Sequence, residues 1–111
     1  MDKTTVVGVA THMETIIRRL AEEGAKSEGL IADMAKATAD FKRERAVAAI
    51  KQKASGVAVT MVKHQAEGDV ADFEAEMIKA THSLKAHFAK REDLRAQLNG
   101  YQSINRHLST I

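Results

Sequence analysis

The sequence predicts an all-α fold: a long antiparallel helical hairpin of the bundle or coiled-coil-like kind, with short N- and C-terminal helices. The 111 residues include no proline, and the many Ala, Lys, Glu and Arg residues favour helix nearly throughout. Apolar residues recur at the three-and-four spacing of one helix face over residues 70–98. Gly68 followed by Asp69 is a turn signal between two such stretches, so we expect the chain to reverse there.

Residues 1–10 are expected to form an extended or flexible arm, because their apolar run VVGVA is short and rich in β-branched side chains. A short first helix is expected over residues 11–23. Thr11 and Glu14 have the spacing of a capping box, in which each side chain bonds the backbone amide of the other residue. Apolar residues then follow on one helix face.

Two glycines interrupt the helical pattern after this first segment. Gly24 and Gly29 each disfavour a helix interior by about 1 kcal/mol relative to alanine, and Ser27 is a candidate N-cap for the next helix. The sevenfold apolar count from residue 13 to residue 41 nevertheless runs through this stretch without a break. The sequence therefore leaves open whether residues 11–66 form two helices or one bent helix.

The two long helices of the hairpin are expected at about residues 28–66 and 69–98. Gly68 would make the turn, Asp69 would cap the second helix, and Ser55 with Gly56 marks a candidate kink. After residue 98, Asn99 with Gly100 predicts a break before a last short helix. The expected core consists of Phe73, Met77, Leu84, Leu94 and Leu98 on one helix and Met34, Phe41, Ile50, Val57 and Met61 on the other.

Length and composition bound the class of protein. A chain of 111 residues is expected to form a single helical domain, residues 1–111. It contains no cysteine, which excludes disulfides and thiolate metal sites. No stretch approaches the roughly 20 apolar residues of a membrane span, and the N-terminus lacks the apolar run of a signal peptide. We therefore expect a cytoplasmic protein without a transmembrane segment.

The residues that carry chemistry are few and scattered. The five histidines do not form a metal-binding or di-iron spacing, and no phosphate loop or nucleophile motif occurs. We expect no catalytic residue, no cofactor and no metal, and hence no enzyme. His87 is unusual because it falls on the apolar stripe. It is interpreted as a partly exposed or hydrogen-bonded residue that sets the register, with a pH-sensitive interface as the sharper alternative.

Charge placement suggests where a partner binds. A turn at Gly68 would set Lys51 beside Lys85 and Arg45 beside Arg91, so that both helices carry positive charge at the same level. This predicted basic end comprises Lys42, Arg43, Arg45, Lys51, Lys53, Lys85, Lys90, Arg91 and Arg95. The competing interpretation is that nearby carboxylates neutralise it, chiefly Glu14, Glu22, Glu23, Asp40, Glu44, Glu92 and Asp93.

The sequence thus favours a non-enzymatic protein-interaction module of the adaptor, chaperone or inhibitor type. It is expected to bind a protein partner through the basic end and to self-associate, most simply as a dimer, because two long helices leave more apolar stripe than one hairpin covers. A nucleic-acid-binding protein that uses the basic end is the alternative. The net charge of only +2 and the acidic residues among the basic ones favour a protein partner.

Overall fold

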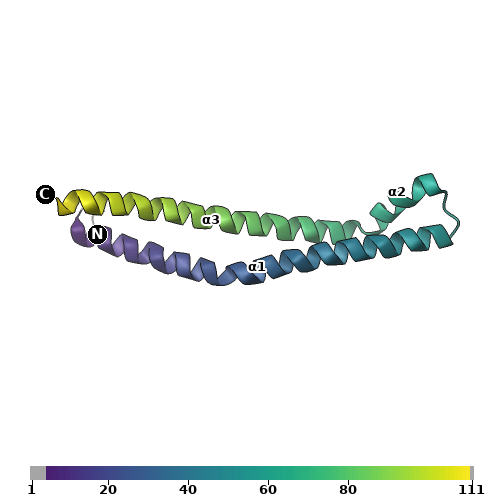
Figure 1. Ribbon diagram of the computed structural model, residues 1–111, viewed down its shortest axis with the longest axis horizontal. Coiled ribbons are helices and arrows are strands. Elements are labelled where there is room, and N and C mark those ends of the chain that lie inside the picture. The colour runs from purple at the N-terminus through teal and green to yellow at the C-terminus, as the bar shows by residue number, and fades with distance from the viewer. Residues whose placement is uncertain (1–4, 111) are drawn as a thin grey trace. The chain divides into compact units, whose positions relative to one another are not determined.

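The computed structural model describes residues 5–110, which form three helices in the order α1 (Val6–Ala54), α2 (Val59–Asp69) and α3 (Ala71–Ser109) (Figure 1). No strand occurs in this part of the chain. The predicted all-α helical hairpin is confirmed, while its element boundaries differ from those expected. Residues 1–4 of the predicted arm lie outside the described residues.

α1 is one helix of 49 residues, so the single-helix alternative is correct as far as Ala54. The helix begins at Val6, upstream of the predicted start, because Thr5 supplies the cap. The backbone amide of Gly8 donates to Thr5 Oγ1 at 3.0 Å, the bond expected of an N-cap. Thr11 lies inside the helix, where its hydroxyl donates to the carbonyl of Val7 at 2.9 Å. The predicted arm at residues 6–10 and the predicted capping box are therefore wrong.

The chain reverses after Ala54, at the position predicted only as a kink. Gly56 has φ of 79°, a left-handed conformation that glycine adopts without steric conflict. Its amide donates to the carbonyl of Lys53 at 3.1 Å, and the amide of Val57 donates to Gln52 at 3.1 Å. This pair of bonds is the Schellman arrangement that ends many helices. The turn therefore joins α1 to α2.

The predicted turn at Gly68 is reduced to a single non-helical residue. Gly68 and Asp69 are the last two residues of α2, and Val70, with φ of −111° and ψ of 17°, separates α2 from α3. The predicted break at Gly100 is also absent, because α3 continues through it to Ser109. Both predictions relied on a local glycine signal, and a helical glycine disfavours the helix by only about 1 kcal/mol.

The described chain packs as two compact units. Among the described residues, unit 1 comprises residues 5–28 and 85–110 and brings the beginning of α1 against the end of α3. The rings of His12 and Tyr101 stack with centroids 5.2 Å apart. Val9, Ile16 and Leu94 are buried, so an apolar seam holds these two segments together in antiparallel order.

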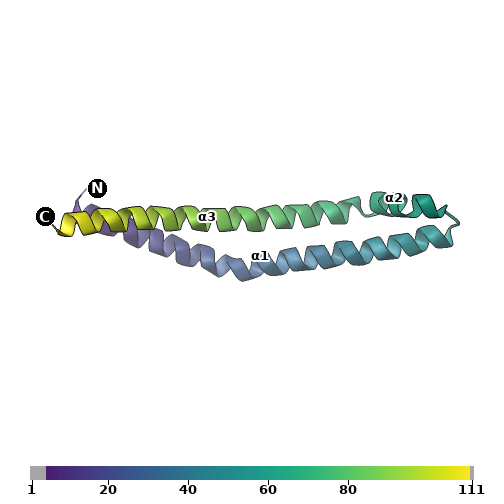
Figure 2. The same ribbon diagram turned by 45° about the horizontal axis from the view of Figure 1, so that its top comes forward.

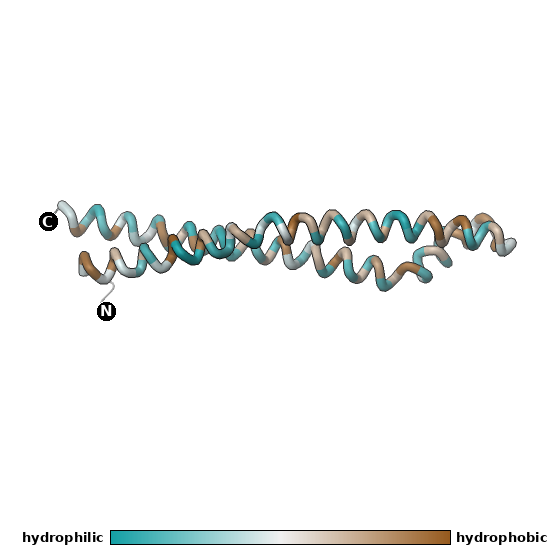
Figure 3. Tube along the Cα trace, turned by 90° about the horizontal axis from the view of Figure 1, so that it is seen from below, coloured by the Kyte–Doolittle hydropathy of each residue, from teal (hydrophilic) through white to brown (hydrophobic). Residues whose placement is uncertain are grey.

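Unit 2 comprises residues 29–84, which include the end of α1, all of α2 and the beginning of α3. The two views agree that α2 runs back beside the end of α1 (Figures 1 and 2). The side-chain amide of Gln52 donates to Asp69 at 2.6 Å and ties the two helices together. Colouring by hydropathy shows apolar residues gathered near the turn between them (Figure 3). The core of unit 2 consists of Phe41, Ala48, Ala66 and Val70.

The predicted core is confirmed in part. Phe41, Leu84 and Leu94 are buried, whereas Ile50 is 67% exposed and Met61 and Phe73 are also exposed. The reason is the position of the turn: the end of α1 packs against the short α2 rather than against a long third helix, so other residues face inward. The remaining predicted core residues are half-buried, namely Met34, Val57, Met77 and Leu98.

Two glycine substitutions test this account of the turn. An alanine Cβ would meet nothing within 4 Å at either Gly29 or Gly56, so the two positions differ in backbone conformation rather than in space. Gly29→Ala, inside α1, is expected to raise the free energy of unfolding by about 0.5–1 kcal/mol. Gly56→Ala is expected to lower it by about 1–2 kcal/mol, the cost of a left-handed non-glycine residue. Urea denaturation followed by circular dichroism measures both, and equal effects would contradict the turn.

Candidate functional site

The residues of the predicted basic end are divided between the two units. Residues 42, 43, 45, 51 and 53 belong to unit 2, and residues 85, 90, 91 and 95 belong to unit 1. The expected register depended on a turn at Gly68, and the observed turn lies at Gly56. Within unit 1, the partner of Lys90 is Glu23. The pairings of Lys51 with Lys85 and of Arg45 with Arg91 therefore lose their basis.

Carboxylates neutralise three of these cations, as the competing interpretation expected. Arg43 lies 2.8 Å from Asp40, Arg95 lies 2.7 Å from Glu92, and Lys90 lies 2.8 Å from Glu23. Arg91 is held by Ser27, whose hydroxyl accepts from the guanidinium at 3.5 Å. Lys51 and Lys85 are exposed.

The other three predicted cations do come together. Lys42, Arg45 and Lys53 line a groove of about 500 Å³ between α1 and α2. α2 adds a fourth cation, Lys63, which lies across the turn from Lys53. We call this site the basic groove. Its full lining is Lys42, Arg45, Ala46, Ala49, Lys53, Val59, Val62, Lys63 and Ala66.

The charge of the basic groove has a single sign, because no carboxylate lines it. In residues 5–110, Lys42, Lys53 and Lys63 form no ion pair or side-chain hydrogen bond. Arg45 places its guanidinium 5.2 Å from the centre of the Phe41 ring, a cation–π contact that leaves its charge uncompensated. Four neighbouring positive charges raise the local potential and favour an anionic ligand.

The remaining surface of the basic groove is apolar. Ala46, Ala49, Val62 and Ala66 lie between the charged residues, and Val59 on the rim is 83% exposed. Small side chains at these positions keep the groove open, because none of them reaches across the space between α1 and α2. The site therefore combines apolar area with peripheral positive charge, which suits an amphipathic ligand.

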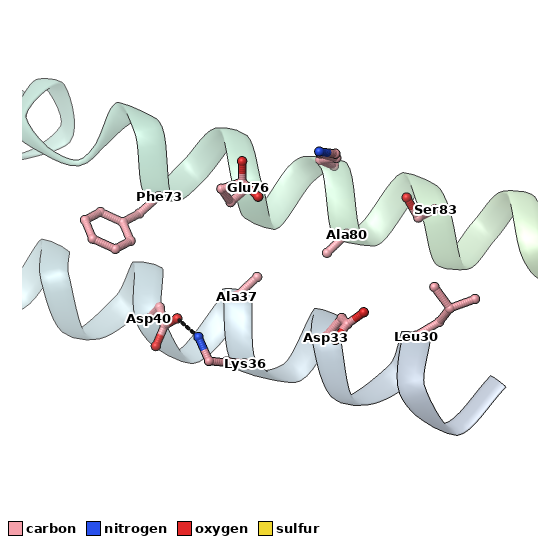
Figure 4. Close-up of a pocket in the computed structure, with 10 residues that line it drawn as sticks. Leu30, Asp33, Lys36, Ala37, Asp40, Phe73, Glu76, Ala80 and Ser83 are labelled. Atoms are coloured by element: carbon pink, nitrogen blue, oxygen red, sulfur yellow. Dashed lines mark hydrogen bonds and ion pairs between the residues drawn. The ribbon is translucent and has the colours of Figure 1, made fainter. Parts of the chain in front are cut away.

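A second groove in unit 2 has a different character. It has a volume of about 400 Å³, and α1 and α3 face each other across it with Ala37 and Ala80 between them (Figure 4). Its charges are mixed, since Asp33, Asp40 and Glu76 line it together with Lys36 and Lys79. Lys36 already binds Asp40 at 3.0 Å, and the contacts of Lys36 and then Arg43 lower the pKa of Asp40. This groove therefore offers no strong preference for one sign of ligand.

Unit 1 contains a buried polar cluster that the sequence indicated only through His87. His87 Nε2 lies 2.7 Å from Ser27 Oγ, and His87 Nδ1 lies 3.3 Å from Glu23 Oε2. Glu23 also accepts from Lys90 at 2.8 Å and from Lys26 at 3.2 Å. The hydrogen-bonded alternative for His87 is confirmed, whereas Ser27 sits inside α1 and is not the predicted cap.

These contacts define what the cluster can do. A carboxylate only accepts, so Nδ1 of His87 carries the proton that faces Glu23, and the Ser27 hydroxyl completes the bond at Nε2. This is the connectivity of a hydrolase triad, but such enzymes also need free amide donors to stabilise an oxyanion. The amides around Ser27 belong to the interior of α1 and bond within the helix. The cluster therefore joins α1 to α3 and fixes their register.

The charge on Glu23 links this cluster to pH. The ammonium groups of Lys90 and then Lys26 lower the pKa of Glu23 from 4.5 to about 2. Because the folded-state pKa is the lower one, the stabilisation is complete above about pH 4.5 and is lost as the pH falls toward about 2. Glu23→Gln is therefore expected to be less stable than the wild type at neutral pH, with a difference that shrinks on acidification.

Urea midpoints measured from about pH 7 to about pH 2 test this expectation. Glu22→Gln is the matched control, because Glu22 is exposed at the preceding position of the same helix. Its midpoint should follow the wild-type curve throughout. Parallel curves for Glu23→Gln and the wild type would contradict the assigned role of Glu23.

The predicted basic end omits Lys63, because the sequence places Lys63 near the end of one long helix, residues 28–66, rather than just after a turn that follows Lys53. Ser55 with Gly56 was the signal that could have revealed the basic groove, since a reversal there brings Lys53 and Lys63 to the same end of unit 2. Among residues 5–110, no three or more His, Asp or Glu side chains converge on a position for a metal ion.

No helix in the described part of the chain is both long enough and apolar enough to cross a bilayer. Comparison with models of protein families, with curated proteins and with solved structures finds no match to this chain.

Proposed function

We propose that this protein is a non-enzymatic helical interaction module, of the adaptor, chaperone or inhibitor type, whose basic groove binds an acidic segment of a protein partner. The observation that carries the proposal is the set of unpaired lysines in this groove. Arg43, Lys90 and Arg95 are compensated by carboxylates, whereas the groove gathers four positive charges with no acidic residue among them. A bound acidic surface would relieve their mutual repulsion and speed association.

The apolar part of the groove favours a protein over nucleic acid. Phosphates would have to approach Ala46, Ala49 and Val62, and burying charge against such side chains is unfavourable. No aromatic residue lines the groove, so it offers no platform for base stacking. An acidic protein segment supplies both carboxylates for the lysines and apolar side chains for the floor.

Self-association is the second part of the proposal. Several large apolar side chains remain exposed in unit 2, among them Ile31, Ile50, Phe73 and Ile78. Exposed apolar area of this kind is commonly covered by another chain. Sedimentation at micromolar concentration is expected to give a mass about twice the 12.1 kDa of one chain. A single species of 12.1 kDa would remove this part of the proposal.

Charge reversal tests the binding part. The four groove cations are changed together, as Lys42→Glu, Arg45→Glu, Lys53→Glu and Lys63→Glu. The variant is expected to lose the partner that the wild type captures from nuclease-treated extract of the native host, with its helical content unchanged. The steep dependence on electrostatic attraction predicts a loss of more than about tenfold in captured partner.

A matched control reverses four exposed cations outside the basic groove. Arg18→Glu, Arg19→Glu, Lys79→Glu and Lys85→Glu give the same change in net charge and should leave capture intact. Equal loss in both variants would mean that overall charge, and not the groove, attracts the partner. Capture that disappears on nuclease treatment would instead favour the nucleic-acid alternative.

A further inference from the structure

We infer that the ligand of the basic groove is a short amphipathic α-helix with carboxylates on both sides of an apolar stripe. It packs as a third helix against α1 and α2. This inference rests on the proposed function, because it names the element of the partner that occupies the same groove. Its basis is the length of the groove, the size of the side chains along its floor and the distribution of charge on its two sides.

The length of the groove follows from α2, which has 11 residues. At about 1.5 Å per residue this helix is roughly 16 Å long, and α1 continues beyond it on one side only. A ligand in contact with both helices over this distance has room for about three helical turns. A segment of this size presents three or four apolar residues at the spacing of one helix face.

The floor of the groove favours close helix packing. Ala46, Ala49 and Ala66 carry only a methyl group, and Val62 is compact. Helices that meet at such residues approach to the shorter end of the usual 8–10 Å range between axes. Larger apolar side chains on the ligand would then enter the space that these residues leave open.

Both helices of the groove contribute positive charge. Lys42, Arg45 and Lys53 lie on α1, and Lys63 lies on α2. A ligand helix seated between α1 and α2 therefore meets positive charge from α1 on one side and from Lys63 of α2 on the other. Carboxylates on one flank alone would leave the opposite side uncompensated, so the preferred ligand carries acidic residues on either side of its apolar stripe.

A helix fits this site better than an extended segment or a second copy of the groove. An extended peptide leaves its backbone amides and carbonyls unpaired unless it adds to a sheet edge, and residues 5–110 contain no strand. A helix satisfies its own backbone bonds. In a twofold dimer, two basic grooves placed face to face would repel each other, because every charge in the groove has the same sign.

Designed peptides of about 14 residues test the inference with the full chain. The first peptide carries leucines on one helix face and glutamates on both flanks. The second is a scramble of the same composition without a stripe, and the third replaces every glutamate with lysine. Binding is followed by fluorescence anisotropy, and the helical content of the peptide by circular dichroism, at about 0.05 M and about 0.5 M salt.

Only the first peptide is expected to bind, with a gain in helical content and with affinity that weakens at high salt. The variant in which all four groove cations are replaced by glutamate should bind the first peptide more than about tenfold more weakly than the wild type. Ala46→Trp places a large side chain in the groove from an exposed position and leaves the charge of the groove unchanged. It should weaken binding of the first peptide as strongly. Ala35→Trp is the matched control, because Ala35 is also exposed on α1 and lines neither groove; it should bind the peptide normally.

The outcomes separate this inference from the proposed function. Equal binding of the scrambled peptide, or none of the first, overturns the helical ligand, while groove-dependent capture of the cellular partner would still support the proposed function. Loss of self-association in the groove-reversal variant would show that a second copy occupies the groove, which also overturns the inference. If reversal affects neither peptide binding nor capture, both proposals fail.

Discussion

Phe41→Ala is expected to lower the free energy of unfolding of unit 2 by about 3–5 kcal/mol. Phe41 is 8% exposed and forms the core of this unit with Ala48, Ala66 and Val70. Two of these three neighbours are alanines, whose side chains cannot move into the space that the ring leaves. The change also removes the ring on which the Arg45 guanidinium lies. A cavity that cannot collapse produces the largest losses of stability.

Phe88→Ala is the matched control, since the same atoms are removed from a ring that is 42% exposed. Its effect should be clearly smaller than that of Phe41→Ala, because a large part of the Phe88 ring is already exposed to water. Urea denaturation followed by circular dichroism gives both values. If the two variants lost the same stability, Phe41 could not be the centre of the core of unit 2.

His87→Leu is expected to destabilise unit 1 by about 1–3 kcal/mol, because the buried imidazole gives up its hydrogen bond to Ser27 and its contact with Glu23. Leucine fills a similar volume, so little of the effect comes from a cavity. The Ser27 hydroxyl loses its 2.7 Å partner, and Glu23 loses the one donor that reaches its Oε2 at 3.3 Å. The two lysines that bind Oε1 remain, so the carboxylate stays charged.

A double-mutant cycle separates the Ser27–His87 bond from general packing effects. Ser27→Ala combined with His87→Leu should be less destabilising than the sum of the two single changes. Either single change already breaks the Ser27–His87 hydrogen bond, so the second change cannot break it again. His82→Leu is the control, since His82 is exposed on the same helix. Strict additivity in the cycle would contradict the hydrogen bond.

The helical class was predictable from composition and apolar spacing, whereas the position of the turn was not. Gly56 and Gly68 both carry local turn signals. Packing between residues far apart in the sequence decides which of the two becomes the turn. Only a turn at Gly56 lets Ala66 and Val70 return to Phe41. For the same reason the sequence did not predict that α3 continues through Gly100. The free-energy cost of one helical glycine is small, and the longer helix forms in spite of it.

The candidate sites were also predictable only in part from the sequence. The positive character of Lys42 and Lys53 was visible in the sequence, and so was the position of His87 on an apolar stripe. Their partners were not. Lys63 joins the groove only once the turn is placed correctly. Ser27 stands 60 residues before His87, and no local pattern announces a hydrogen bond across that distance.

The division into two units also determines the order in which the apolar residues of a growing chain become buried. Contacts within unit 2 close short loops, as Gln52 and Asp69 do at 17 residues apart. Unit 1 joins Glu23 to Lys90, 67 residues later, and each doubling of a loop adds about 0.6 kcal/mol of closure entropy. During synthesis the N-terminal segment emerges first, yet Val9 and Ile16, both buried in the finished unit, stay uncovered until the end of α3 has left the ribosome. The beginning of α1 is thus made well before the segment that buries it, and its apolar residues stay open to aggregation in the meantime.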